Sequence, residues 1–346
     1  MKIPKASKHN HKYEFSGESQ LFFGRPVWRI IRSSDKEKGG WIESEANLSF
    51  QGSCWVADNA IVADKARVED DAIVCDQSEV FDSSTIRGSA IVCEEARVID
   101  FSDVSEASKI YGNAVVGGTS KISGQCLING DALVCGNATV KNRASVSGSA
   151  MLLEDAGVYG RARVSGKAVL MSKARAFGNS SIFGNAEVSG KAWVCGSARV
   201  YEQAKVSGSA IISEQAEVFG NARVYEKAKL FGNSWICNDA KVFGKAQISE
   251  GAGIFDYARV FGNSVISGNA KVTEYASVYG NARMQERSEI SGEAKLFGSA
   301  ELKGREHLSS GSRASNLGSA QQRSPIHKCH CALQDLMIGG CLCGGL

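Results

Sequence analysis

The sequence lacks the long apolar segments that mark membrane proteins and secreted precursors. Its 346 residues contain no apolar run of the length that a membrane-spanning helix needs, about 18 residues or more. The opening residues, MKIPKASKHNHK, hold no apolar segment of the kind found in signal peptides. We therefore expect a cytoplasmic protein without membrane contacts.

A strong excess of charge of one sign is also missing. The chain has 40 Lys and Arg residues against 37 Asp and Glu, which gives a formal net charge of +3. Proteins dedicated to nucleic acid usually carry a clear basic excess, because much of their affinity comes from contacts with phosphate groups. We therefore expect no nucleic-acid partner.

Histidine is scarce and confined to the two ends of the chain. The five histidines are His9, His11, His307, His327 and His330. No histidine lies between Lys12 and Glu306. A general base must reach the proton that it removes, directly or through one water. The central segment offers no imidazole for that role.

What the sequence does have is a strict repeat of six residues. From Gly52 to Lys303 it contains 42 consecutive hexads of the form turn, turn, small, any, aliphatic, any, with no insertion or deletion. The third position holds 31 Ala, 9 Ser and 2 Cys, and the fifth is aliphatic or Met except at Ala176. In an extended strand these two positions point to one side, and the fourth and sixth to the other. The repeat therefore predicts a core of Ala and aliphatic side chains.

A short fixed period of this kind is typical of a β-solenoid. A helical period would drift out of phase within a few hexads, and Gly interrupts most of them. Gly and Asn at the first two positions fit corners, because both residues tolerate positive φ. The hexads resemble those of the single-stranded left-handed parallel β-helix, an all-β fold in which three hexads form one triangular coil. That resemblance implies about 14 coils in residues 52–303, and a rod roughly 65–70 Å long.

The segments outside the repeat have different characters. We expect residues 1–11 to be a flexible N-terminus. Residues 12–51 contain strand-like runs around Gly24-Arg25-Pro26 and predict a small antiparallel β cap over the first coil. Residues 304–346 are Ser-rich and aperiodic, which favours a disordered or atypical tail. Such an abrupt change is also what a frameshifted C-terminus would produce.

The stretch GGWIESEANLSFQGSCWVADNA, from Gly39 to Ala60, resembles the N-terminal signature of the YdcK-like hexapeptide-repeat proteins of enterobacteria. The resemblance covers Tyr13 to about Leu302, and it is specific at Gly39, Gly40, Trp41, Cys54 and Trp55. It implies an acyltransferase that uses an acyl-CoA or acyl-carrier donor. It also implies a trimer with active sites between the subunits and a histidine as the general base. This chain departs from that pattern because residues 12–306 lack histidine and no loop interrupts the hexads.

Two functions remain open at this point. The first is a rigid scaffold or binding rod that is not catalytic and needs no cofactor. In one interpretation, this rod forms a homo-oligomer such as a trimer. The alternative is an acyltransferase of the hexapeptide-repeat class that uses acyl-CoA, with Asp, Glu or Cys in place of the missing histidine.

A coil of three hexads would align outward residues into columns on one face. The predicted binding or oligomer face comprises Arg223, Tyr225, Lys241, Phe243, Arg259, Phe261, Tyr279, Lys295 and Phe297. Three interpretations remain open. The rings stabilise neighbouring strands while nearby corner acids neutralise the cations, or rods associate through this face, or the face binds a polyanion or sugar polymer. A shorter aromatic column on another face favours the first interpretation.

Seven of the 11 cysteines lie in the repeat. Cys54 and Cys126 are predicted to face inward, whereas Cys75 and Cys93, one predicted coil apart, are predicted to stack on the outside. The other outward positions are Cys135, Cys195 and Cys237. We expect reduced thiols without disulfides. The tail pattern has poor spacing for zinc, so no metal site is predicted; its residues are His327, Cys329, His330, Cys331, Cys341 and Cys343.

Overall fold

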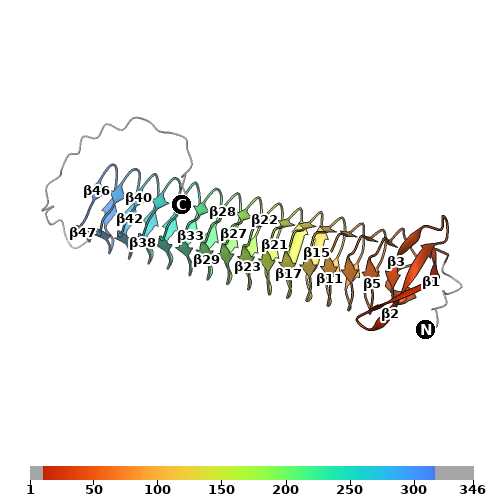
Figure 1. Cartoon of the computed structure of the whole chain (residues 1–346). Helices are drawn as coiled ribbons and strands as arrows, with labels where there is room; N and C mark the ends of the chain where they lie inside the picture. Colours follow the sequence, from red (N-terminus) through yellow and green to blue (C-terminus); the bar gives the residue numbers. More distant parts are fainter. Residues whose placement is uncertain (1–10, 316–346) are drawn as a thin grey trace, which may run out of the picture. The chain divides into compact units, whose positions relative to one another are not determined.

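A computed structural model describes residues 11–315 as an all-β parallel solenoid of about 15 turns (Figure 1). Every solenoid strand from β4 (Trp55–Val56) to β47 (Arg313–Ala314) begins at the fourth residue of a hexad. Most of them span only two residues, and the longer exceptions are β15 (Lys121–Gly124) and β18 (Thr139–Asn142). The predicted fold class is confirmed, whereas the handedness of the coil stays a prediction.

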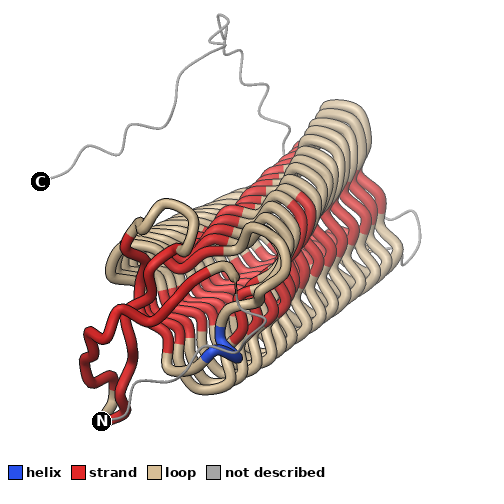
Figure 2. The backbone as a smooth tube through the Cα atoms, turned by 90° about the vertical axis from the view of Figure 1, so that its right-hand side faces the viewer, coloured by secondary structure: helices blue, strands red, loops and turns tan. Residues whose placement is uncertain are grey.

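The strands form three sheets, of 18, 15 and 14 strands, which make the sides of the prism (Figure 2). Each solenoid strand pairs with the strand that lies three hexads further along the chain. In the 18-stranded sheet, for example, Arg223 lies opposite Lys241, and Val224 lies opposite Val242. One turn therefore consists of three hexads, as predicted, and each turn adds one strand to every sheet.

The core side of the strands is as uniform as the repeat predicts. The third and fifth residues of the hexads are almost completely buried, and in the middle of the rod Ala222 and Val224 are 0% exposed. Most buried serines at the third position form a local hydrogen bond with their hydroxyl group, and the exceptions are Ser180 and Ser234. The Ser78 Oγ, for example, donates to the Cys75 carbonyl oxygen at 2.7 Å. Such bonds matter because an unsatisfied buried hydroxyl costs free energy.

The corners share one backbone conformation. The first residue of every hexad from Gly52 to Gly304 has positive φ, and where it is not Gly it is mostly Asp or Glu. These acids compensate for the strain that a side chain meets there. The Glu202 carboxylate accepts a hydrogen bond at 2.8 Å from the backbone N–H of Gly220, one coil further on. Asp70 does the same for the N–H of Gly88 at 2.9 Å.

The N-terminal cap consists of three antiparallel strands, β1 (Tyr13–Phe22), β2 (Arg25–Arg32) and β3 (Lys38–Ile42). β3 then pairs in parallel with β5 (Ile61–Val62), so the cap continues the 18-stranded sheet. The β1–β2 hairpin projects from the end of the prism (Figure 2). The 3-10 helix η1 (Glu45–Asn47) follows, and no helix among residues 11–315 is long and apolar enough to cross a membrane.

The hairpin turn lies one residue earlier than the sequence suggested. Phe23 and Gly24 form it, with φ values of 45° and 77°, and Pro26 already pairs with Leu21 inside the hairpin. Positive φ at both central residues gives a two-residue turn whose twist matches that of the strands. The sequence prediction placed the turn at Gly24-Arg25-Pro26 because Pro is common in turns. In the structure, Pro26 is a strand residue instead.

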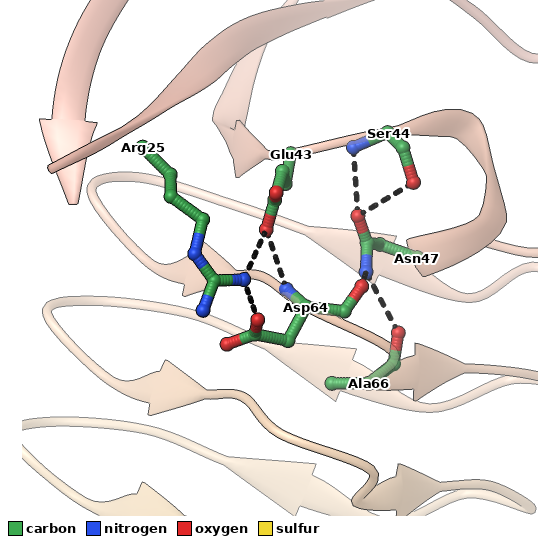
Figure 3. Close-up of polar contacts among 6 residues, drawn as sticks. All are labelled: Arg25, Glu43, Ser44, Asn47, Asp64 and Ala66. Atoms are coloured by element: carbon green, nitrogen blue, oxygen red, sulfur yellow. Dashed lines mark hydrogen bonds and ion pairs between the residues drawn. The ribbon is translucent and has the colours of Figure 1, made fainter. Parts of the chain in front are cut away.

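Asn47 joins the cap to the first coil (Figure 3). Its side chain is fully buried, and its Nδ2 donates to the carbonyl oxygens of Asp64 at 3.0 Å and Ala66 at 2.9 Å. The Asn47 Oδ1 accepts from the Ser44 N–H at 2.8 Å. Beside it, the Glu43 carboxylate accepts from the Asp64 N–H at 2.7 Å. These bonds fix the chain where it enters the repeat.

Close packing of β3 against the first coil explains Gly40. A Cβ at this residue would lie 2.6 Å from the Ala60 carbonyl oxygen and 2.6 Å from Val56 Cγ1. The neighbouring Trp41 is 8% exposed, and the Arg29 guanidinium lies 4.2 Å from the centre of its ring. This cation–π contact joins β2 to β3 within the cap.

The solenoid continues to Ala314, past its predicted end at Lys303. β46 (His307–Leu308) pairs with β43 (Glu289–Ile290), and β47 pairs with β44 (Lys295–Leu296). The prediction stopped early because Glu306 occupies a third position, where every earlier hexad has Ala, Ser or Cys. The predicted flexible N-terminus, apart from residue 11, and the predicted tail from residue 316 onward lie outside the described residues.

We predict that Val224→Asp destabilises the rod by at least about 3 kcal/mol, because it places an unpaired carboxylate in the core. Asn221→Asp, at an exposed position of the same hexad, is the matched control and should melt like the parent. Thermal unfolding followed by circular dichroism measures both. A parental melting temperature for Val224→Asp would contradict the assignment of the core side.

We also predict that Asn47→Ala lowers the free energy of unfolding of the cap by about 1–3 kcal/mol, because it leaves two carbonyl oxygens without their donor. The readout is amide hydrogen exchange, which should accelerate in β3 and the first coil and stay unchanged beyond residue 200. Asn113→Ala, an exposed corner amide, serves as the control. Parental exchange in β3 would show that Asn47 does not hold the cap.

Candidate binding face

The structure places all nine residues of the predicted face on one side of the 18-stranded sheet. They come from or directly follow β32 (Arg223–Val224), β35 (Lys241–Val242), β38 (Arg259–Val260), β41 (Ser277–Val278) and β44. These five strands pair in register, each with the next. The fourth positions therefore form a column of cations interrupted at Ser277, and the sixth positions form a column of aromatic rings beside it.

The aromatic column is a continuous stack. From Tyr225 to Tyr279 the ring centres are 4.8–4.9 Å apart with interplanar angles of 3–4°, and Phe297 follows at 5.3 Å. Each ring is half-buried by its neighbours. Same-face pairs of this kind stabilise adjacent strands by roughly 0.2–1 kcal/mol each. The stack therefore has a structural role whether or not it meets a partner.

The cations beside the stack lack partners within the chain. Among the described residues, no ion pair within 4.0 Å and no side-chain hydrogen bond involves Arg223, Lys241 or Arg259. Of the corner acids expected to neutralise them, Asp256 is engaged elsewhere, because it accepts from the Asn238 side chain at 2.9 Å and from a backbone N–H at 3.2 Å. Asp239 lines the same groove but forms no ion pair with the three cations within 4.0 Å. Three like charges one strand apart repel one another. Their arrangement favours an external anion.

The shorter aromatic column provides an internal comparison. Phe183, Tyr201 and Phe219 stack at 4.8 and 5.0 Å, and Arg199 lies over the Tyr201 ring at 5.1 Å. Here Glu217 pairs with Arg199 at 3.1 Å and accepts from the Tyr201 hydroxyl at 2.8 Å. Burial and the Glu217 carboxylate raise the pKa of Tyr201. This column neutralises its own charge, whereas the longer one does not.

Sequence reasoning missed two tyrosines on the other side of the cationic column. Tyr257 and Tyr275 hold the second position of their hexads, are 52% and 62% exposed, and stack at 5.0 Å. With the cations they line a groove of about 350 Å³, formed by Asn221, Arg223, Asp239, Lys241, Tyr257, Arg259, Tyr275 and Ser277. Their spacing of one full coil was the available signal, but they hold the second position of the hexad, outside the two columns of the predicted face.

A second groove on the same side continues this surface toward the N-terminus. It is about 580 Å³ in volume and is lined by Asn185, Glu187, Gln203, Lys205, Asn221, Arg223 and Asp239. The last three of these residues belong to both grooves. Here Lys205 has a partner, because it pairs with Glu187 at 2.8 Å. We call the first of the two grooves, lined by residues from Asn221 to Ser277, the basic-aromatic groove; its role in binding stays a prediction.

Six cysteines of the rod are free thiols, namely Cys54, Cys75, Cys93, Cys126, Cys135 and Cys195. Cys237 occupies an outward position but is only 5% exposed. Cys75, Asp76 and Cys93 form the one group within residues 11–315 that brings three metal-ligand atoms within 4.8 Å of one another. Burial, followed by the nearby Asp76 charge, raises the pKa of Cys75 to about 12. Metals bind thiolates, so this pair is poorly prepared as a metal site. The tail pattern considered for zinc lies outside the described residues.

His307 is the one histidine on the described solenoid. Its Nε2 lies 2.9 Å from the Ser291 hydroxyl oxygen, in an exposed position. The absence of histidine from residues 12–306 still holds, but β46 brings this imidazole onto the last turns. His307 lines neither groove described above. Acid–base catalysis usually requires a concave site that excludes water, and this exposed pair does not provide one.

No family model matches the chain, and no curated protein matches it significantly. The resemblance to YdcK-like proteins therefore stays a prediction carried by the residues between Gly39 and Ala60. The structure supports the hexapeptide-repeat architecture that this resemblance implies.

We predict that Cys75 reacts slowly with iodoacetamide near neutral pH. With a pKa of about 12 instead of 9.0, its thiolate fraction at pH 8 is about 1,000-fold lower than that of an ordinary thiol. The rate should rise about tenfold per pH unit up to pH 11, as measured by peptide mass spectrometry against a free cysteine peptide. A plateau near pH 9 would show an ordinary thiol instead.

Proposed function

We propose that this protein is a non-catalytic, rigid scaffold whose basic-aromatic groove binds an extended anionic polymer, such as an acidic polysaccharide. One observation carries the proposal. Arg223, Lys241 and Arg259 form an unpaired cationic column between the exposed Tyr257–Tyr275 pair and the stacked rings. Cations without internal partners and accessible aromatic faces are the groups that recognise charged, ring-containing chains.

The spacing of the groove favours a polymer over a small molecule. Strand pairing repeats the same set of groups about every 4.8 Å along the rod. A chain lying along the axis would meet one cation in each of three successive coils. The net charge of the protein is small, so long-range attraction contributes little and affinity depends on contacts that salt weakens.

The alternative of acyl transfer receives no specific support from the geometry. The grooves contain no histidine, the hexads are uninterrupted, and the thiol pKa of Cys75 is raised rather than lowered. A catalytic cysteine requires the opposite shift. Use of acyl-CoA therefore stays an untested alternative. Association of parallel rods through the cationic column is also untested, and it would bring like charges together.

Binding of heparin and of uncharged dextran to the full chain, measured by calorimetry, tests the proposal. Lys241→Gln/Arg259→Gln should weaken heparin binding at least tenfold and reduce its dependence on salt. Lys229→Gln/Lys271→Gln removes two exposed cations from the other two sheets, and it should bind like the parent. Equal losses in both variants, or equal binding of dextran and heparin, would contradict the proposal.

A further inference from the structure

The outer face of the 18-stranded sheet carries an apolar strip at mid-rod. It spans four adjacent strands, β14 (Val115–Val116), β17 (Leu133–Val134), β20 (Met151–Leu152) and β23 (Val169–Leu170). We call it the central strip. Its outward residues, at the fourth and sixth positions, are Val115, Gly117, Leu133, Cys135, Met151, Leu153, Val169 and Met171. All but Gly117 are half-exposed, although none of them is charged or strongly polar.

The other two sheets of the same turns differ from the strip. At the equivalent outward positions the 14-stranded sheet has Asp103, Lys121, Thr139 and Lys141, among others. The 15-stranded sheet carries Lys109, Ser145 and Arg163 there. In a sheet with one buried face, apolar residues point inward and polar residues outward, so the solvent-facing side is normally polar. In these four turns, the 18-stranded sheet alone carries no charge at the fourth and sixth hexad positions. An uncharged apolar surface of this kind indicates that another molecule covers it.

Charged residues frame the central strip in a fixed order. On its N-terminal side, Glu79 is followed by Arg97, and the two side chains pair at 3.0 Å. On its C-terminal side, Glu187 is followed by Lys205, with a pairing distance of 2.8 Å. Along the rod the fourth positions therefore read acid, base, four apolar residues, acid, base. This order is complementary to itself when it is reversed.

We propose that two copies of the protein pair antiparallel through the central strip. A two-fold axis that runs between the strands of Leu133 and Met151 brings the central strips of the two subunits into contact. The same axis places Glu79 opposite Lys205 of the partner subunit, and Arg97 opposite Glu187 of the partner subunit. A parallel pair would instead oppose each charge to its own copy, which is repulsive. The charge order therefore selects the antiparallel arrangement.

Side-chain size along the sixth positions agrees with the same axis. Phe81, which packs against Phe22 of the cap hairpin at 5.5 Å, would face Ser207 of the partner subunit. Ile99 would face Ser189 of the partner subunit. Bulky residues at one end of the interface thus meet small residues at the other, which leaves room for the hairpin beside the partner.

The size of the surface is sufficient for a specific dimer. Eight strands, from the strand of Glu79 to the strand of Lys205, extend over about 38 Å, and one side of the prism is at most about 20 Å wide. Their product is about 760 Å² per subunit, close to the roughly 800 Å² that typical specific interfaces bury on each partner.

Light scattering on a sizing column tests the dimer. The full chain should have twice its mass of 36.8 kDa. Leu133→Glu/Met151→Glu should raise the dissociation constant at least 100-fold, so that the protein elutes as a folded monomer. Leu127→Glu/Ser145→Glu places the same charges at equivalent outward positions of the 15-stranded sheet, and it should leave the dimer intact. A monomeric parent, or a dimer that survives the first variant, overturns the proposal.

Orientation is tested by cross-linking the variant Glu79→Cys/Lys205→Cys. Within one chain the two positions are seven strands apart, about 34 Å, so a disulfide between them can form only between two chains. Peptide mass spectrometry after mild oxidation should find residue 79 linked to residue 205. Links of residue 79 to residue 79 and of residue 205 to residue 205 would instead show a parallel pair and contradict the proposed arrangement.

Discussion

Backbone hydrogen bonds between successive coils hold each residue opposite the residue three hexads further along the chain. This register converts a linear repeat into straight columns, because a side chain at a given hexad position always stacks on its counterpart in the next coil. The Arg223–Lys241 pairing is one example. The buried core, the corner carboxylates, the aromatic stack and the central strip all depend on it. A shift by one residue would send the core side chains to the solvent.

Because the core and corners repeat with little variation, differences in function must come from the outward positions. On the 18-stranded sheet these positions change character along the rod. They are charged near Glu79 and Arg97, apolar from Val115 to Met171, and cationic and aromatic from Arg223 onward. One side of a regular prism thus offers two distinct surfaces. In the proposed dimer, the two copies of the basic-aromatic groove lie toward opposite ends of the assembly, each opposite the partner's first coil and cap.

The core and its period follow from the sequence because each inward position tolerates only small or aliphatic residues. Features that depend on one particular contact were harder to predict. Glu306 breaks the rule for the third position, yet its hexad still pairs with the coil before it. Cys237 holds an outward position but is 5% exposed, which its hexad alone does not reveal. Pro26 suggested a turn, but Phe23 and Gly24 adopt the required positive φ.

The sequence predicted the columns of the candidate face but not the charge partners of its cations. Columns at the fourth and sixth positions are visible once the coil length is assumed, and the structure aligns them as expected. Whether Arg223 and its neighbours are neutralised depends on where individual carboxylates point. Asp256 bonds to the Asn238 side chain and the Glu274 N–H of the neighbouring coils rather than to the cations, and only side-chain geometry reveals this.

The most direct test of the account concerns the register itself. Arg223→Cys/Lys241→Cys places two thiols on paired strands of successive coils, whereas Arg223→Cys/Lys229→Cys places them in successive hexads on different sheets. After mild oxidation, peptide mass spectrometry should detect a disulfide within one chain in the first variant and none in the second, since paired strands bring Cα atoms within disulfide range. Equal yields in the two variants would contradict the coil of three hexads, and with it both proposed surfaces.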